Sequence, residues 1–193
     1  SYHLPQGRSP LEIRYLFHLD GSVDVRCSFQ PRLEMLRFGL QAELSRALDQ
    51  AAWYGRGPHE TMPDRKNSGL IAIHRAPSSQ LHHSYLFPQE NGSRTDVRWV
   101  EFTGKQGRGI HFRCLDRQLL IFSLWPYTQQ DLLDAAHPHQ LPERDLYTLN
   151  IDHGQRGVGD LFSLMYGRDP ETRLPKGEYY QYGFRIIPDS TPR

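Results

Sequence analysis

The stretch LEIRYLFHLDGSVDVRCSF, residues 11–29, indicates the fold more clearly than any other part of the chain. Apolar and polar residues alternate along both of its halves, which is the pattern of β-strands with one buried face. Asp20-Gly21 stands between the halves and is a preferred dipeptide for a tight hairpin turn. The stretch therefore predicts an antiparallel hairpin whose apolar face comprises Leu11, Ile13, Tyr15, Phe17, Val23, Val25, Cys27 and Phe29.

Similar short segments follow along the chain and are separated by Gly, Pro, Asn and Asp, which favour turns. A single segment, residues 128–137, is predicted to be helical, because Thr128 suits an N-cap and Asp131 the capping-box position. Many strands with almost no helix predict an all-β fold, an antiparallel sandwich or barrel. The further strand candidates are RFGLQAEL (37–44), GLIAIHR (69–75), VRWVEFTG (97–104), GIHFRCL (109–115), LLIFSLW (119–125), YTLNID (147–152) and YYQYGFRII (179–187).

Length and composition are those of one globular domain. The chain has 193 residues, of which 37% are hydrophobic, so it can bury a core. Its 23 Lys and Arg balance 22 Asp and Glu, whereas a nucleic-acid-binding protein would show a basic excess. No apolar run approaches the roughly 18 residues that a membrane-spanning helix needs. We expect a single domain over residues 1–193 with a frayed tail at 189–193, and neither nucleic acid nor a membrane as partner. The start at Ser1, without a signal-peptide pattern, is interpreted as the edge of a processed or cut chain.

The stretch WYGRGPHETMPDRK, residues 53–66, concentrates charged residues, glycine and proline as an active-site loop would. Glu60 and Asp64 are four residues apart, and glycoside hydrolysis uses a pair of carboxylates. Arg56 and Arg65 stand beside them and can neutralise both. We therefore predict a turn network that stabilises the fold rather than a catalytic loop.

A second charged cluster, LFPQENGSRTDVRW, occupies residues 86–99. Glu90 and Asp96 flank Arg94 and Arg98 around an Asn-Gly turn. A carboxylate and a guanidinium held on a turn can bind sugar hydroxyls, and they can equally fix a loop across a sheet. The structural role is the preferred interpretation.

Histidine and cysteine, the residue types that most often bind transition metals, do not form a complete site in the sequence. His137 and His139 form a His-x-His pair, but Pro138 interrupts the chain there and no further ligand stands nearby. Cys27 and Cys114 are far apart and indicate buried free thiols. No phosphate-binding glycine loop and no nucleophile motif is present. We expect no catalytic and no metal-binding residue in this chain.

The segment NIDHGQRGVGDLFSLMYG, residues 150–167, joins a strand to a glycine-containing loop that is rich in large apolar side chains. Gly157 and Gly159 permit positive φ angles. Core packing is the ordinary explanation of such apolar residues. A loop tip that stayed exposed would instead be a contact surface for a sugar or for another domain.

Taken in order, these motifs resemble one known family, the C-terminal domain of large family 2 β-galactosidases, which is also called the small chain domain. The resemblance extends over about residues 13–188 and no single motif decides it. The motifs are Gly-x-Gly-Pro-x-Glu with Asp-Arg (55–65), Glu-Asn-Gly-x-Arg (90–94), Tyr-Thr-Gln-Gln-Asp-Leu (127–132), His-x-His (137–139), Asn-Ile-Asp (150–152), Gly-Val-Gly (157–159) and the closing LPKGEYYQYGFRIIP (174–188).

The resemblance implies an antiparallel β-sandwich of the galactose-mutarotase-like supersandwich type, incomplete at its N-terminal side because the family's domain begins before residue 1. It implies a parent enzyme that hydrolyses terminal β-galactosides such as lactose with retention. In that family the catalytic glutamates and the activating magnesium lie on a separate (β/α)₈ barrel. The isolated chain is therefore expected to be inactive and to hold no cofactor, while the parent enzyme is expected to use magnesium and could also bind sodium.

The expected partners follow from the same resemblance: the catalytic barrel, as a domain or a subunit, and the β-galactoside. The accessory domain would complete the active-site wall and support subunit assembly. Family members are commonly tetramers or dimers, so we expect a homo-oligomer for the full enzyme, located in the cytoplasm.

One residue of the family's C-terminal domain reaches the active site, a tryptophan in a Gly-Gly-Asp-Asp-Ser-Trp loop that stacks on sugar. In this chain the tryptophan position falls on Leu164, and Phe162 replaces one aspartate. Tyr166 and Phe162 are the aromatic residues that could take over the stacking. The predicted substrate-binding residues are thus Phe162, Leu164 and Tyr166, and the departure leaves open a parent that prefers a different β-galactoside.

Two other classes of function stay open. The first is a free-standing carbohydrate-binding or adhesion sandwich without an enzymatic partner. The second is a sugar epimerase on the mutarotase-like fold, which needs a histidine acid and a glutamate base in one cleft. His59 with Glu60 and His83 with Glu90 are the candidate pairs.

Overall fold

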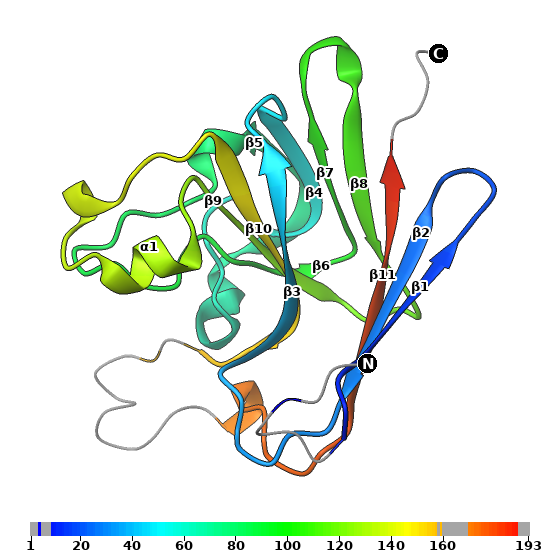
Figure 1. The fold of residues 1–193 in the computed structure, drawn as a ribbon. Helices are drawn as coiled ribbons and strands as arrows, with labels where there is room; N and C mark the ends of the chain where they lie inside the picture. Colours follow the sequence, from blue (N-terminus) through cyan, green and yellow to red (C-terminus); the bar gives the residue numbers. More distant parts are fainter. Residues whose placement is uncertain (1–3, 5–8, 158, 160–169, 189–193) are drawn as a thin grey trace.

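Two antiparallel β-sheets form the described part of the chain (Figure 1). The computed structural model describes residues 4, 9–157, 159 and 170–188. The larger sheet has seven strands in the order β1 (Glu12–Phe17), β2 (Val23–Phe29), β11 (Tyr180–Pro188), β8 (Gly109–Cys114), β7 (Trp99–Thr103), β4 (Gln50–Gly57) and β5 (Leu70–Pro77). The smaller sheet has four, in the order β3 (Arg37–Ser45), β10 (Leu146–Gln155), β9 (Leu120–Trp125) and β6 (Arg94–Val97). The predicted all-β class and antiparallel sandwich are confirmed.

Helical segments are short. They are α1 (Gln129–Asp134) and the 3₁₀ turns η1 (Pro63–Ser68), η2 (Ser78–Gln80), η3 (Lys105–Gly107), η4 (Pro138–Gln140) and η5 (Pro170–Thr172). No helix among the described residues is both long enough and apolar enough to cross a lipid bilayer.

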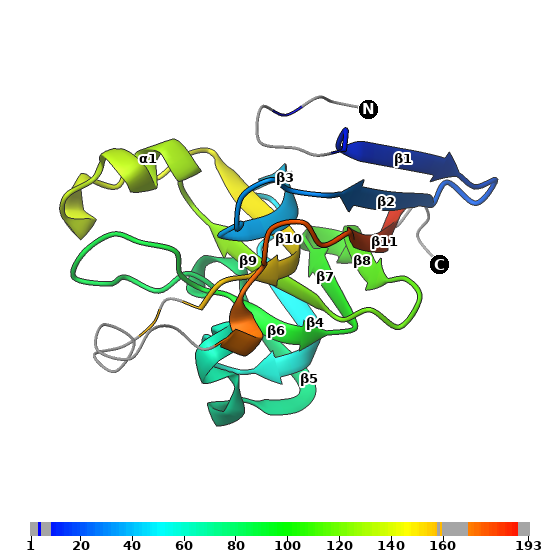
Figure 2. The ribbon, with the colours of Figure 1, turned by 90° about the horizontal axis from the view of Figure 1, so that it is seen from below.

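The hairpin predicted from residues 11–29 forms β1 and β2, with Gly21 in the turn at a φ of 81° that suits glycine. Two of the eight residues predicted for the apolar face are wrong, because Tyr15 and Phe17 of β1 are 56% and 76% exposed. Among the described residues β1 is an edge strand that pairs with β2 alone, and the end of the hairpin extends past the smaller sheet (Figure 2). The predicted residues that are fully buried are those of β2: Val25, Cys27 and Phe29.

The predicted turn over residues 53–66 is wrong in its first part, because residues 53–57 belong to strand β4. β4 lies between β7 and β5, and its Trp53 is completely buried. The Trp53 indole meets Phe122 of β9 edge to face, with 5.8 Å between ring centroids, and so joins the two sheets. Gly55 marks a close approach and not a turn, since a Cβ there would lie 2.8 Å from Cγ2 of Val97.

The capping box predicted for the helix is confirmed. The Thr128 side chain accepts from the backbone N–H of Asp131, and the Asp131 carboxylate accepts from Thr128. The helix ends at Asp134, earlier than predicted, with Ala135 already extended as its C-cap; further on, Pro138 disfavours a helical conformation at His137, which is extended. Buried Leu132 packs with aromatic residues next to β9 and fixes α1 against the smaller sheet.

The smaller sheet has two faces of different character. One faces the larger sheet and supplies core residues such as Phe122, Leu149 and Ile151. The other is turned toward α1 and the segment before β6 (Figure 1) and carries polar side chains at alternating positions of β3, β10 and β9. This second face positions the candidate site.

Candidate functional site

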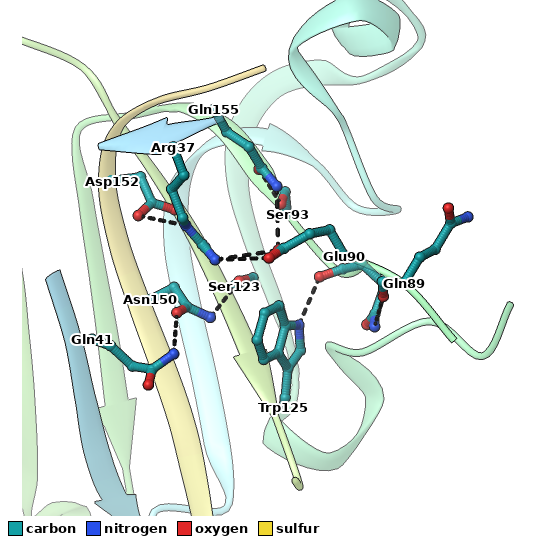
Figure 3. Close-up of polar contacts among 11 residues, drawn as sticks. Arg37, Gln41, Gln89, Glu90, Ser93, Ser123, Trp125, Asn150, Asp152 and Gln155 are labelled. Atoms are coloured by element: carbon teal, nitrogen blue, oxygen red, sulfur yellow. Dashed lines mark hydrogen bonds and ion pairs between the residues drawn. The ribbon is translucent and has the colours of Figure 1, made fainter. Parts of the chain in front are cut away.

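The polar side chains of the smaller sheet form hydrogen-bonded groups, which we together call the polar face (Figure 3); the largest of them is a network around Arg37. Strand alternation brings them to one side, since the core residues occupy the intervening positions of the same strands. The segment before β6 supplies the remaining members from across the sheet. The polar face comprises Arg37 and Gln41 of β3, Asn150, Asp152 and Gln155 of β10, Ser123 and Trp125 of β9, and Glu90, Asn91 and Ser93.

Arg37 lies at the centre of this network. Its guanidinium binds Asp152 through two hydrogen bonds, with Nε–Oδ1 at 2.9 Å and Nη2–Oδ2 at 2.7 Å. Its third nitrogen, Nη1, donates to both carboxylate oxygens of Glu90 at 3.1 and 3.2 Å. The guanidinium carbon also lies 5.7 Å from the centre of the Trp125 ring. One arginine therefore binds two carboxylates from different elements of the fold.

The two carboxylates differ in exposure, and burial raises the pKa of both. The Asp152 side chain is 2% exposed and that of Glu90 30% exposed. Burial raises the pKa of Asp152 to about 6, and the attraction of Arg37 acts against this rise. Burial likewise raises the pKa of Glu90, again opposed by Arg37. At neutral pH Asp152 is thus an ionised partner of Arg37, enclosed by protein.

A β-bulge completes the network. The register of β10 against β3 shifts between Asp152 and Gly154, so that Gln155 comes opposite Arg37. Gln155 donates to Glu90 at 3.3 Å and accepts from the hydroxyl of Ser93 at 3.0 Å. Without the extra residue of the bulge, Gln155 would point to the opposite face of the sheet.

Gly39 makes room for Asp152. The two residues are cross-strand partners, and a Cβ at position 39 would lie 1.7 Å from Oδ1 of Asp152. Only glycine lets the carboxylate lie flat over β3 and reach Arg37. The glycine in RFGLQAEL is therefore a requirement of the network.

The lower part of the polar face is fixed by amide and indole groups (Figure 3). Gln41 donates to Asn150 at 2.9 Å, and Asn150 donates to the hydroxyl of Ser123 at 3.0 Å. The indole N–H of Trp125 donates to the backbone carbonyl of Asn91 at 2.8 Å, which ties the segment before β6 to the sheet. Asn150, Ser123 and Trp125 are buried and paired, which holds this part of the site rigid, while Gln41 is exposed at its edge.

The network borders a cavity of about 270 Å³. Its wall is polar on the side of the network and includes Gln129 at the first turn of α1. The lining residues are Leu36, Arg37, Gln89, Glu90, Gln129, Gln155, Arg156 and Gly157. Carboxylate, amide and guanidinium groups of this kind suit hydrogen bonding to a hydroxylated ligand.

The groups around the cavity suit hydrogen bonding to a ligand. A glycosidase needs two carboxyl groups that reach the sugar from either side of the scissile bond. Asp152 is enclosed, and Glu90 shares the same guanidinium with it. Of the charged groups around the cavity, Glu90 and Arg37 are partly accessible, at 30% and 18% side-chain exposure.

The predicted substrate-binding residues Phe162, Leu164 and Tyr166 lie outside the described residues. The described chain leads toward them from the cavity, which Gly157 lines. The N–H of Gly159 donates to Oδ2 of Asp64 at 2.7 Å, and a Cβ on Gly157 would come within 2.3 Å of the same carboxyl group. Asp64 thus anchors the start of the glycine loop.

The predicted turn network is correct in part. Arg65 approaches Glu60 at 4.0 Å, as predicted. Arg56 instead pairs with Asp96 and donates to the carbonyls of Lys66 and Gly69, because β4 carries it toward β6. The sequence places Glu60 and Asp64 in one turn, but their carboxylates hold different segments. Glu60 accepts from the Tyr85 hydroxyl and the Gly92 N–H, and Asp64 from Gly159.

The second charged cluster is structural, as predicted, but with other partners. Arg94 is buried and donates to the carbonyls of Leu81, Gly92 and Pro58. Glu90 reaches β3 to bind Arg37. The cluster therefore fixes the loop across the smaller sheet and supplies one wall of the cavity.

The histidines considered for chemistry have structural surroundings. The His59 ring is at hydrogen-bond distance from the Ser68 hydroxyl, and the His83 ring packs edge-on against Tyr85. The rings of His137 and His139 stack at 5.6 Å between centroids. Within the ranges that the structure describes, no group of three or more His, Cys, Asp or Glu side chains is placed to hold a metal ion.

Fold and site together define a class of protein: an antiparallel two-sheet β-sandwich with a polar face and a buried arginine–carboxylate pair. The profile of the family described as "Beta galactosidase small chain" matches residues 2–186. The chain belongs to this family.

Longer relatives support this family membership. The chain is 32% identical over 179 residues to a protein named beta-galactosidase from Priestia megaterium, covering 91% of this chain and 17% of that protein. It is 34% identical over 192 residues to a beta-galactosidase from Vibrio cholerae, covering 95% of this chain and 18% of the relative. A beta-galactosidase from Arthrobacter is 34% identical over 141 residues, which are 71% of this chain and 14% of that protein. The chain thus spans less than a fifth of the length of these relatives.

The sequence analysis singled out Glu90 in a cluster interpreted as structural and Asn150 and Asp152 in a family motif, but it assigned none of them to a site and did not single out Arg37 or Gln155. A signal for Arg37 was present, because RFGLQAEL alternates and places Arg37, Gly39 and Gln41 opposite the apolar positions. Gln155 had no such signal, since it reaches the network through a bulge that alternation cannot show.

Proposed function

We propose that this chain is a non-catalytic accessory domain of a β-galactosidase-like glycoside hydrolase, in which it supplies one wall of the substrate site. The observation that carries the proposal is the cavity beside Arg37, Glu90 and Gln155, rigidly built and lined with groups that pair with hydroxyls. Membership of the β-galactosidase small chain family supports the same assignment.

The role of each residue follows from its contacts. The ion pair of Arg37 and Asp152 holds the side of the cavity in place. The accessible parts of Glu90 and Gln129 are available to the ligand. Asp64 fixes the entry to the loop that carries Phe162, Leu164 and Tyr166, which we propose as the sugar-contacting segment. Proton transfer and nucleophilic attack would come from carboxylates of the catalytic region outside these residues.

The proposed substrate of the parent enzyme is a terminal β-galactoside such as lactose. Its catalytic region is the proposed partner, with magnesium and sodium belonging to that region and not to this chain. The full enzyme is proposed to be a cytoplasmic homo-oligomer. The polar groups of the cavity suit a sugar, and the network that enforces its shape leaves no carboxylate pair free for catalysis.

The test is reconstitution from two pieces. The chain and the remainder of its parent polypeptide are produced separately, and hydrolysis of a chromogenic β-galactoside is measured for each piece and for the mixture. We expect activity in the mixture and none from the chain alone. Turnover by the purified chain, or a remainder that is fully active without it, would refute the accessory role.

A further inference from the structure

The outer face of the larger sheet carries an exposed set of side chains near the β5 edge. The strand register places Arg113, Trp99, Tyr54 and Ile73 in one row across β8, β7, β4 and β5. These positions point away from the core, because Trp53, the neighbour of Tyr54 on β4, is buried between the sheets. Tyr54 is 37% exposed and Ile73 56% exposed. The row forms a surface and not a second core.

Two further arginines, Arg98 and Arg117, lie beside this row and its Arg113. The guanidinium carbon of Arg98 lies 5.0 Å from the centre of the Tyr54 ring, and its Nη1 donates to the carbonyl of Asp96 at 2.6 Å. Arg113 and Arg117 are exposed. In the part of the chain that the structure describes, no ion pair with a carboxylate is found for any of the three. Together with Tyr54 and Trp99 they line an open depression of about 750 Å³.

The apolar part of the surface continues onto β5. Ile71 and Ile73 lie on the same outer face at 46% and 56% exposure. Over the described residues β5 pairs with β4 alone, so the backbone groups along its other edge have no strand partner. An exposed apolar edge strand is a typical contact site for further protein.

The observations favour a protein partner over a sugar or a small anion. Stacking of a sugar on Tyr54 is disfavoured, because Arg98 already covers that ring. A small anion would use the arginines but would leave the isoleucines exposed. Trp, Tyr and Arg with few acidic residues are the composition of protein interface centres. Unpaired arginines select carboxylates on the partner.

We infer that this outer docking face, formed by Tyr54, Ile71, Ile73, Trp99, Arg98, Arg113 and Arg117, binds an acidic surface of the remainder of the parent polypeptide. The inference rests on the proposed function, which supplies a partner of this kind. The arginines of the face argue for an acidic partner surface, and the chain makes up 17% and 18% of two relatives, which leaves most of their length to supply it.

The test measures the affinity of the chain for the separately produced remainder by titration calorimetry. Each of Arg113→Glu and Arg117→Glu is expected to raise Kd about tenfold, and raising the salt from about 50 to about 200 mM should weaken the wild-type complex. Ile73→Ser should also raise Kd, without the change in salt dependence. Arg14→Glu is the matched control, since Arg14 lies on the opposite edge strand β1, is 77% exposed and should leave Kd unchanged.

The outcomes separate the docking face from the proposed function. If the wild-type chain binds and restores activity but the Arg113, Arg117 and Ile73 variants bind equally well, the docking face is wrong and the accessory role stands. If the wild-type chain neither binds nor restores activity, both fail. If instead sedimentation shows the chain dimerising and Arg113→Glu abolishes the dimer, the face joins two copies of this chain and the inference is overturned. Circular dichroism of every variant verifies that it folds.

Discussion

The polar face of the smaller sheet and the outer docking face of the larger sheet both contain arginines beside an aromatic ring, but they differ in pairing. On the polar face, Arg37 is bound by Asp152 and Glu90 and packs against Trp125. On the outer face, Arg98 lies over Tyr54 and carries no carboxylate partner within the described chain. The charges of the first surface are paired within the domain, whereas those of the second are available to the partner that we propose.

The two faces should also differ in how substitutions change the free energies of folding and association. Removing one member of a buried ion pair leaves an uncompensated charge, so substitutions on the polar face should act on stability. Exposed arginines contribute little to folding, so substitutions on the outer face should act on association. Matched substitutions on the two faces therefore test whether one face acts on stability and the other on association.

The largest effect is expected for Arg37→Gln. Because Asp152 would lose its buried partner, the free energy of unfolding should fall by about 3–5 kcal/mol. Chemical denaturation monitored by tryptophan fluorescence measures it. The matched variant Arg113→Gln on the outer face should change it by less than about 0.5 kcal/mol. Equal losses for the two variants would mean that the faces do not differ as described.

Gly39→Ala should have the next largest effect. The added methyl group would occupy the position of the Asp152 carboxylate, 1.7 Å away, and overpacking of this kind costs about 1–3 kcal/mol. Thermal unfolding provides the measurement. In an Asp152→Ala background the same substitution should cost less, because the clashing carboxylate is gone. A cost that is the same in both backgrounds would place the strain elsewhere.

Asp131→Asn tests the helix that covers the polar face. The Arg144 guanidinium and the Thr128 cap hold the pKa of Asp131 well below its usual range, so its ionised form stabilises the fold. The variant should lose about 1 kcal/mol at pH 7, a typical value for a capping interaction. A lowered pKa confers stability above the unfolded value of about 4 that is lost as the pH falls below it. The difference between wild type and variant should therefore shrink below that pH, and a constant difference would contradict the assignment.

The smallest effect on stability is expected for Ile73→Thr on β5. Ile73 is 56% exposed, so its replacement should alter the free energy of unfolding by no more than about 0.5 kcal/mol. Ile151→Thr is the matched substitution, since Ile151 is 2% exposed in the core and its loss should be clearly destabilising. A strongly destabilised Ile73 variant would show that β5 depends on this side chain for folding.

Much of the fold follows from local pattern. Alternation and turn residues predict the hairpin of residues 11–29, and side-chain capping predicts the start of α1 at Thr128. The same reasoning failed at β4, because Gly55 looks like a turn residue and is in fact required where β6 passes close to the strand. Sequence shows that a glycine is needed but not which neighbour requires it.

The candidate site was less predictable, for a physical reason. Asp152 and Glu90 are 62 positions apart and meet only because Arg37 joins them across the sheet. Such pairings are long-range and leave no local periodicity. The family resemblance identified residues 157–159 as the entry to a functional loop, and the contact between Asp64 and Gly159 explains how that entry is held.

The most direct test of the substrate wall and the docking face compares one variant from each region in the two-piece enzyme. Gln129→Trp would fill the cavity of about 270 Å³ beside the polar face, whereas Arg113→Glu alters the outer docking face. Steady-state kinetics with lactose should show a raised KM for Gln129→Trp at an unchanged affinity between the pieces. Arg113→Glu should weaken that affinity and leave KM unchanged once the pieces are saturated. If Gln129→Trp leaves KM unaltered, or if Arg113→Glu alters KM but not association, the assignment of substrate wall and docking face is contradicted.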